Sequence, residues 1–256
     1  MLKIATWNVN SLRVRLPHLL DWVAANQPDI VALQETKLPD SDFPVAEIHQ
    51  AGYQVVFSGQ KTYNGVAILS RTPAGDVVTD IPGLDDEQRR ILAVSFDGLR
   101  VVNVYIPNGQ SVGSDKYSYK LTWLEKLMSY LRHELENHPR LVLLGDFNIA
   151  PEDRDVHDPK AWEGQVLVSE PERAYFRKLL DLGFSDSFRL FEQAPETYSW
   201  WDYRMGAFRR NRGLRIDHIM VSPELRAVCR AACIDKSPRK LERPSDHTPV
   251  FAEFEL

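Results

Sequence analysis

Short apolar runs recur from one end of the chain to the other and predict a protein built mainly of β-strands. The runs are rich in valine, isoleucine and leucine, and glycine, proline or charged residues interrupt them. This pattern is typical of strands. We expect strands at residues 2–7, 29–33, 55–57, 66–70, 91–96, 101–106, 141–144, 198–201, 216–221 and 250–254.

Three stretches show the spacing of amphipathic helices instead, at residues 12–26, 114–137 and 169–182. The second stretch predicts one buried stripe from apolar residues three and four positions apart, namely Leu121, Leu124, Met128, Leu131 and Leu135. The third begins with Ser169 and Glu172 in the capping-box arrangement and stops at Gly183. Many strands with few helices between them predict two packed sheets with helices outside.

Composition places the chain among ordinary globular proteins and excludes several other classes. Apolar residues make up 43% of the 256 residues and charged residues 26%. No stretch is long enough to span a bilayer and no linker divides the chain, so we expect a single catalytic domain over residues 1–256, a cytoplasmic location and a monomer. Cys229 and Cys233 provide no disulfide framework, and both are interpreted as small buried residues. The net charge of −5 argues against a protein that coats nucleic acid, but it leaves room for a local basic groove.

Polar residues that can carry chemistry fall at the ends of apolar runs. There are five such places: Trp7-Asn8-Val9-Asn10, Leu33-Gln34-Glu35-Thr36, Gly145-Asp146-Phe147-Asn148, Arg215-Ile216-Asp217-His218 and Ser245-Asp246-His247. If the sheets bring these ends to one rim, carboxylates crowd together and repel one another. A bound divalent cation relieves that repulsion, and oxygen ligands favour Mg²⁺, with Mn²⁺ as the alternative.

Each residue also has an ordinary structural interpretation. Glu35 alone suits a solvated turn, Asp146 alone suits a turn cap, and His247 alone suits a structural histidine. Asp217 is harder to explain in this way, because a carboxylate inside an apolar run needs a partner. The ordinary interpretations weaken together, since all the pieces occur at run ends in one chain.

These pieces and several others resemble the exonuclease III family of abasic-site endonucleases. The matching motifs lie in that family's order and span the chain: Trp-Asn-Val-Asn (7–10), Leu-Gln-Glu-Thr-Lys (33–37), Gly-Gln-Lys (59–61), Asn-Gly-Val-Ala (64–67), Tyr-Ile-Pro-Asn-Gly (105–109), Leu-Gly-Asp-Phe-Asn-Ile-Ala-Pro (144–151), Ser-Trp-Trp-Asp-Tyr-Arg (199–204), Gly-Leu-Arg-Ile-Asp-His-Ile (213–219) and Pro-Ser-Asp-His-Thr-Pro-Val (244–250). The resemblance implies a four-layer α/β sandwich of two mainly antiparallel sheets flanked by helices.

The resemblance also implies roles for individual residues. The implied catalytic residues are Asp146, Asn148, His247, Asp217, Tyr105 and Asn8. The implied surroundings of the metal are Glu35, as the principal ligand, with Asn8, Asp146, Asn148, Asp246 and His247. Asp217 would hold the imidazole of His247 on the phosphate, and Tyr105 would face the phosphate or the leaving group. Whether Asp146 or His247 takes the proton of the attacking water stays open at this stage.

Contacts to double-stranded DNA are expected from a basic region and an apolar pocket. Four arginines within 209–215, including Arg212, together with Lys116 and Lys120, suit a groove that follows the phosphate backbone. Trp200, Leu214 and Ile216 fall where the family builds a pocket for a sugar without a base. Residues 153–168 carry no chemical signature and are expected to flank the DNA groove, and His218 has no assigned role.

The predicted function is therefore a magnesium-dependent DNA repair phosphodiesterase that cuts at abasic sites and trims 3′ ends. The alternative is an enzyme specific for 3′ ends, an exonuclease and phosphatase that lacks abasic-site cleavage. A lipid or inositol phosphatase would share the metal cluster, but the 199–204 motif and the arginines argue against it. A non-catalytic binding protein should have lost Glu35, Asp146 or His247, and all three are present.

Overall fold

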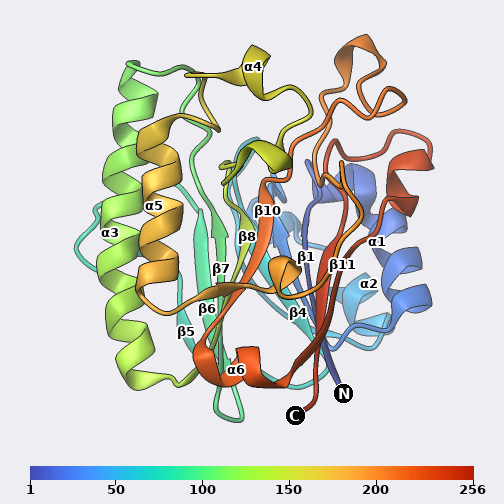
Figure 1. Ribbon diagram of the computed structural model, residues 1–256. Helices are drawn as coiled ribbons and strands as arrows, with labels where there is room; N and C mark the ends of the chain where they lie inside the picture. Colours follow the sequence, from blue (N-terminus) through green and yellow to red (C-terminus); the bar gives the residue numbers. More distant parts are fainter.

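The computed structural model describes residues 1–256 and contains two six-stranded sheets that pack face to face (Figure 1). The first sheet has the order β11-β12-β1-β2-β4-β3. Its strands are β1 (Leu2–Asn8), β2 (Ile30–Gln34), β3 (Gln54–Ser58), β4 (Val66–Ser70), β11 (Cys229–Ile234) and β12 (Val250–Phe254). Of its five strand pairings only β1 with β2 is parallel.

The second sheet repeats this arrangement with the order β5-β6-β7-β8-β10-β9. Its strands are β5 (Gly75–Val78), β6 (Ile91–Phe96), β7 (Leu99–Tyr105), β8 (Arg140–Asp146), β9 (Ser185–Asp186) and β10 (Asp217–Val221). Here only β7 with β8 is parallel. The prediction of two mainly antiparallel sheets is confirmed.

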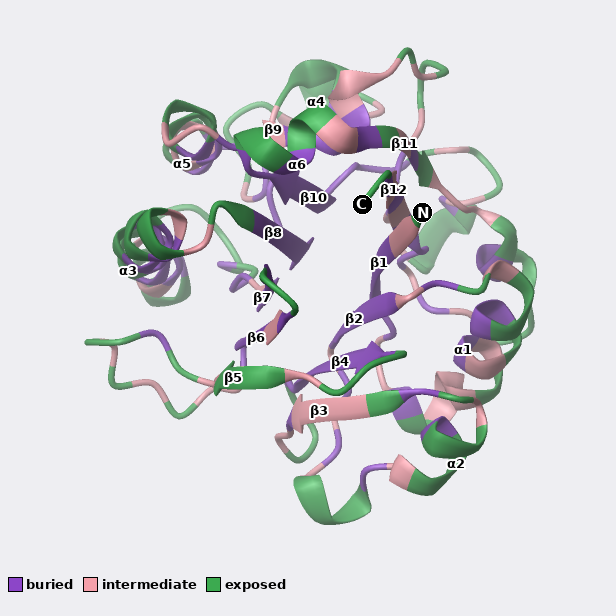
Figure 2. Ribbon diagram, turned by 90° about the horizontal axis from the view of Figure 1, so that it is seen from below, coloured by how far each residue is buried: buried purple, intermediate pink, exposed green.

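Helices cover the outer face of each sheet, which gives four layers (Figure 2). The first sheet packs against α1 (Leu12–Asn26) and α2 (Val45–Gln50), and the second against α3 (Asp115–Asn137) and α5 (Glu170–Asp181). The layer between the sheets is filled by side chains of both, among them Ile4, Ile68, Val142 and Ile219. Two short helices, α4 (Pro159–Trp162) and α6 (Pro223–Val228), lie in connections.

The two parallel pairs explain why the polar strand ends meet. Strands β1, β2, β7 and β8 all point to the end of the sandwich opposite the two termini (Figure 1). The antiparallel strand β10 begins there, with Asp217 opposite Asp146. Below Asp146, Gly145 has a φ of 142°, and a Cβ atom on it would lie 1.9 Å from the carbonyl oxygen of Val104. Glycine at this position therefore allows β8 to approach β7 directly beneath the site.

The structure also departs from the sequence-based expectations. Residues 198–201 form no strand, because Trp200 makes only isolated bridges to Leu214 and His247. Strands β5, β9 and β11 and helices α2, α4 and α6 were not predicted, and they are short or lie at sheet edges. Cys229 is buried as expected, but Cys233 is exposed. No helix is long and apolar enough to cross a membrane.

Candidate active site

Three of the predicted residues converge at the rim of the sandwich. Glu35 follows β2, Asp146 ends β8 and His247 precedes β12. Their ligand atoms all lie within 4.8 Å of one another. Asp146 and His247 are buried, whereas the side chain of Glu35 is 18% exposed. The site is thus open to a ligand on the Glu35 side and closed on the other.

Asn8 at the end of β1 holds the two carboxylates in place. Its Nδ2 donates to Oε1 of Glu35 at 2.8 Å and to Oδ2 of Asp146 at 2.9 Å. Its Oδ1 accepts the backbone N–H of Asn10. Both N–H groups and the oxygen of the side-chain amide are therefore engaged by the protein, so Asn8 acts in this structure as a positioning residue for the carboxylates. The backbone of Glu35 has a φ of 52°, which is uncommon for this residue type and is typical of functional sites.

His247 lies between two aspartates. Its Nδ1 is 2.9 Å from Oδ2 of Asp217, and its Nε2 is 3.6 Å from Oδ2 of Asp146. Burial by itself lowers the pKa of His247, but the carboxylates of Asp217 and Asp146 outweigh burial and raise it to about 10. The imidazole is therefore cationic at neutral pH, with a proton on Nε2 directed away from Asp217. Such a group donates to a phosphate oxygen and is a poor metal ligand or base.

Asp146 has the opposite character. Burial raises its pKa to about 7, helped by the charge of Asp217 and opposed by His247 and by the hydrogen bond from Asn8. Its Oδ1 accepts the backbone N–H of Asn148 at 2.9 Å. Because His247 is protonated, the carboxylate of Asp146 is the group of this pair that is left to accept a proton.

Asn148 turns the chain directly after Asp146, with a left-handed φ of 49°. Its Nδ2 donates to the carbonyl of Ile106, and its Oδ1 accepts Nδ2 of Asn108 at 3.1 Å. Asn108 is exposed next to Asn148, and no role was expected for it although it stands in the Tyr-Ile-Pro-Asn-Gly motif. Asn10 and Lys37 were missed in the same way: Asn10 contacts Asp246, and the Lys37 Nζ lies 2.9 Å from Glu35.

Tyr105 ends β7 next to Asp146 in the parallel pair. Burial raises the pKa of its hydroxyl well above the ordinary value, and the charges of Glu35 and Asp146 add to this effect. The guanidinium of Arg90 stacks on the ring at 4.6 Å. Tyr105 is therefore a fixed, protonated hydroxyl that faces the carboxylates.

The donor set fits a hard divalent cation. Glu35 and Asp146 bring two carboxylates together, and burial disfavours the charged form of Asp146. Oxygen ligands of this kind suit Mg²⁺ or Mn²⁺. Asp246 lies outside this group: Trp200 donates to its Oδ2 and Asn10 to its Oδ1, both at 2.9 Å. Its place in the structure is that of a residue that orients Trp200.

The expected apolar pocket is filled. Leu214 and Ile216 are 0% and 2% exposed and belong to one cluster with Ala150, Val156, Leu167 and Val168, against which Trp200 packs. Three members of this cluster, Val156, Leu167 and Val168, come from the 153–168 segment, which was expected to flank the DNA groove. Leu167 is the most unusual of them, because it is buried with a left-handed φ of 78°, a region that bulky residues rarely adopt.

Two basic residues that were expected to contact DNA are inside the protein. The expected contact between Lys120 and the DNA backbone is wrong for this structure: its side chain is 0% exposed and pairs with Glu172. Arg215 is also buried, 1% exposed, so it cannot belong to a phosphate-binding surface. Arg209, Arg210 and Arg212 are exposed, as the prediction requires.

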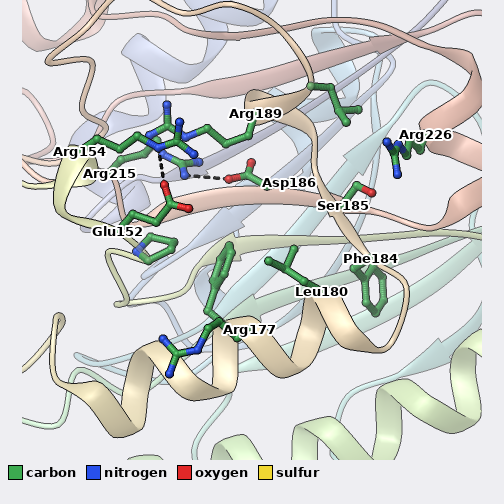
Figure 3. A pocket seen from close by; sticks show the side chains of 13 residues that line it. Glu152, Arg154, Arg177, Leu180, Phe184, Ser185, Asp186, Arg189, Arg215 and Arg226 are labelled. Atoms are coloured by element: carbon green, nitrogen blue, oxygen red, sulfur yellow. Dashed lines mark hydrogen bonds and ion pairs between the residues drawn. The ribbon is translucent and has the colours of Figure 1, made fainter.

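Arg215 is instead the centre of a buried network beneath the site, part of which is visible in Figure 3. Its Nε donates to Asp155 and one NH₂ group to Asp186, both at 2.7 Å. The other NH₂ group lies 3.1 Å from Nδ1 of His218, whose Nε2 lies 2.9 Å from the carbonyl of Ile149. Burial, together with the charge of Arg215, lowers the pKa of His218 to about 4. The extra histidine is therefore a neutral bridge between Arg215 and the loop that carries Asn148.

Comparison with known proteins shows the family of the chain. The model of the endonuclease/exonuclease/phosphatase family matches residues 5–247. An exodeoxyribonuclease III of Haemophilus influenzae is 38% identical to this chain over 267 aligned residues, which cover 99% of the chain and all of the relative. The chain belongs to the exonuclease III family of DNA repair nucleases. It is an exodeoxyribonuclease III-like nuclease, a phosphodiester hydrolase.

Three solved structures of related proteins match this chain over its full length and over their own full length. The 3′-phosphatase NExo from Neisseria, bound to a product DNA hairpin, is 49% identical with a TM-score of 0.98, and the 3′-5′ exonuclease NExo from Neisseria meningitidis is 50% identical with a TM-score of 0.97. An AP endonuclease from Archaeoglobus fulgidus is 42% identical with a TM-score of 0.97. These relatives are named for different activities. The choice among those activities for this chain therefore has to come from its own site.

Proposed function

We propose that this protein processes the 3′ ends of duplex DNA, removing 3′-phosphates and terminal nucleotides with the help of a divalent cation, and that it cuts internal abasic sites poorly. This is the alternative that the sequence left open. The observation that carries it is the burial of Leu214 and Ile216, which belong to one packed apolar cluster with Leu167 and its neighbours. The two relatives named for 3′-phosphatase and 3′-5′ exonuclease activity, at 49% and 50% identity, support the same choice.

The roles of the site residues follow from their contacts. Glu35 and Asp146 would hold Mg²⁺ or Mn²⁺, which would neutralise charge on the phosphate when bound. Asp146 orients the attacking water and takes its proton. His247, kept protonated by Asp217, donates from Nε2 to a phosphate oxygen. The Tyr105 hydroxyl faces the same phosphate, and Asn148 fixes the loop on the other side. These contacts supply the base and the charge stabilisation that phosphodiester hydrolysis requires.

The path of the DNA is proposed from the exposed basic surface. A hollow beside the site is lined by polar residues that include Gln60, Asn64, Asn108 and Lys116. Arg212 and its exposed neighbours Arg209 and Arg210 lie near the beginning of β10, on the chain segment that leads to Asp217. Backbone contacts of this kind give strongly salt-dependent binding without sequence preference.

The second candidate function is abasic-site cleavage. It is favoured by the presence of Trp200, Leu214 and Ile216 and by the Archaeoglobus fulgidus AP endonuclease at 42% identity. An abasic sugar, once turned out of the helix, needs a small apolar space to enter. In this chain Leu214 and Ile216 are buried in one cluster with side chains from the 153–168 segment, so the second candidate requires this cluster to open.

The experiment compares three duplexes of one sequence: one with a 3′-phosphate at a gap, one with a recessed 3′-hydroxyl end and one with an internal abasic site. Each is incubated with Mg²⁺, with Mn²⁺ and with excess chelator. We expect cation-dependent turnover of the first two and little incision of the third. Full activity in excess chelator would refute the proposed dependence on a divalent cation. Efficient incision of the abasic duplex would refute the proposal that internal abasic sites are cut poorly.

A further inference from the structure

A buried ion pair behind the site has no role in the mechanism described above. Lys120 on α3 and Glu172 on α5 form a salt bridge, and both side chains are 0% exposed. The Lys120 ammonium also donates to the carbonyl of Asn148 at 2.6 Å and to that of Asn108 at 3.2 Å. All three of its donors are therefore used, and two of them fix the backbone of residues beside the reacting phosphate.

The Glu172 side of the pair reaches the covering segment. Its Oε1 accepts the backbone N–H of Leu167 at 3.0 Å, and its Oε2 accepts that of Ser169 at 3.1 Å. The hydroxyl of Ser169 also donates to the same carboxylate, and the Ser169 side chain accepts the backbone N–H of Glu172, which completes the capping box of α5. The contact with Ser169 is what a capping box needs. The contacts with Leu167 and Lys120 go beyond it.

The pair thus joins two residues with left-handed backbones. Asn148 has a φ of 49° and Leu167 a φ of 78°. Such conformations cost free energy and persist only where surrounding contacts hold them. One charged contact holds both: the ammonium fixes the carbonyl of Asn148, and the carboxylate fixes the amide of Leu167.

We propose that Lys120 and Glu172 are a positioning pair, which sets Asn148 for turnover and Leu167 for exclusion of abasic sugars through one buried contact. The inference rests on the roles proposed above for Asn148 and Leu167. Neither residue of the pair touches substrate. Their effect is carried by two backbone groups, so the loss of the pair should displace both ends together.

The test uses Lys120→Met, Glu172→Gln and the double variant that carries both changes. The double variant keeps an acceptor for the amide of Leu167 and leaves no uncompensated buried charge, so it can be studied even if a single change prevents folding. The matched control is the pair Arg100 and Glu134, 3% and 8% exposed, which joins β7 to α3 away from the site. Its double variant is Arg100→Met with Glu134→Gln.

We expect the Lys120/Glu172 double variant to lose about tenfold or more in kcat for 3′-phosphate release with an unchanged KM for DNA, because misplacement of a reacting group by about 1 Å costs turnover on this scale. We also expect its rate of abasic incision to rise relative to phosphate release. The Arg100/Glu134 double variant should lose stability to denaturant but keep kcat. A KM effect alone, or equal kcat losses in both double variants at matched stability, would overturn the positioning role.

The same measurements separate this inference from the proposed function. Asn148→Ala is assayed alongside. If Asn148→Ala keeps full turnover, the proposed role of Asn148 fails. If Asn148→Ala is inactive while the Lys120/Glu172 double variant keeps both wild-type kcat and wild-type selectivity, the proposed function stands and the positioning pair is wrong.

Discussion

Replacing Leu167 with glycine removes one of the buried side chains that pack in the same apolar cluster as Leu214 and Ile216. Leu167 is 4% exposed, and truncation of a buried leucine costs about 2–5 kcal/mol of folding free energy. Part of this cost is offset here, because glycine accepts the φ of 78° without the strain of about 1–2 kcal/mol that a side chain brings. We therefore expect a net loss of up to about 4 kcal/mol, which a stable domain of this size tolerates.

Although the Leu167→Gly change lowers stability, it should raise the rate of abasic-site incision. On the proposed function, the loss of this side chain opens the cluster around Leu214 and Ile216, so that a sugar without a base can enter. We expect abasic incision to rise at least about tenfold relative to 3′-phosphate release, which corresponds to about 1.4 kcal/mol of transition-state binding. The assay is single-turnover cleavage of the two duplexes at saturating enzyme, so that differences in DNA affinity do not enter.

Leu179→Ala is the control for this prediction, because Leu179 is 3% exposed in a different apolar cluster, between α5 and the second sheet. It should lower stability by a comparable amount and leave the ratio of the two activities unchanged. The reasoning is refuted if Leu167→Gly folds, retains phosphate release and gains no abasic incision, or if Leu179→Ala gains it equally.

Further predictions follow from the site and its surroundings. Glu35→Gln should weaken Mn²⁺ binding measured by calorimetry and remove most turnover with no change in fold by circular dichroism; unchanged affinity would argue against this ligand. Asp217→Asn and His247→Asn should each cost about 10²–10⁴-fold in kcat, and the double variant should be little worse than either, whereas multiplied losses would show that the two residues act separately. Because the pKa of His218 falls from 6.5 to about 4 on folding, the unfolded chain takes up its proton first as the pH drops. Its contribution, on the order of 3 kcal/mol, should be complete above pH 6.5 and lost between about 6.5 and about 4, and urea unfolding of His218→Gln should lack this component. An identical pH dependence in that variant would contradict the neutral bridge.

The candidate catalytic residues could be located because strand ends are visible in the sequence. Glu35 and Asp146 each follow an uninterrupted apolar run, and such runs predict buried strands whose ends share a rim. Asp217 was predictable because a carboxylate in an apolar run needs a partner. The packing of two sheets then placed these ends together.

The contacts behind the site were not predictable in the same way. Lys120 was expected on the surface, yet it occupies the buried face of α3 with Tyr117, Leu124, Leu127 and Leu131. The spacing of three and four residues indicates this buried face. It does not reveal that Glu172, 52 positions later, forms an ion pair with Lys120. A buried charge is stable only with such a partner, and partners brought together by tertiary folding leave no local pattern.

The burial of the expected apolar pocket could not be predicted either, because it also depends on tertiary contacts. Trp200, Leu214 and Ile216 are the residue types of a sugar pocket, and the sequence therefore predicted one. Whether the space between them is open depends on a loop more than 30 residues earlier in the chain. The left-handed conformation of Leu167, which turns the side chain into the cluster, has no signature in the sequence because the usual marker, glycine, is absent.

The central claim is that this enzyme of the exonuclease III family acts on 3′ ends and excludes internal abasic sites. The most direct measurement is the ratio of single-turnover rates of the wild-type protein on two duplexes of identical sequence, one with a 3′-phosphate and one with an internal abasic site, at saturating enzyme and Mg²⁺. We predict that phosphate release is faster by at least about 100-fold, which corresponds to about 2.7 kcal/mol. Equal rates, or faster abasic incision, would contradict the account.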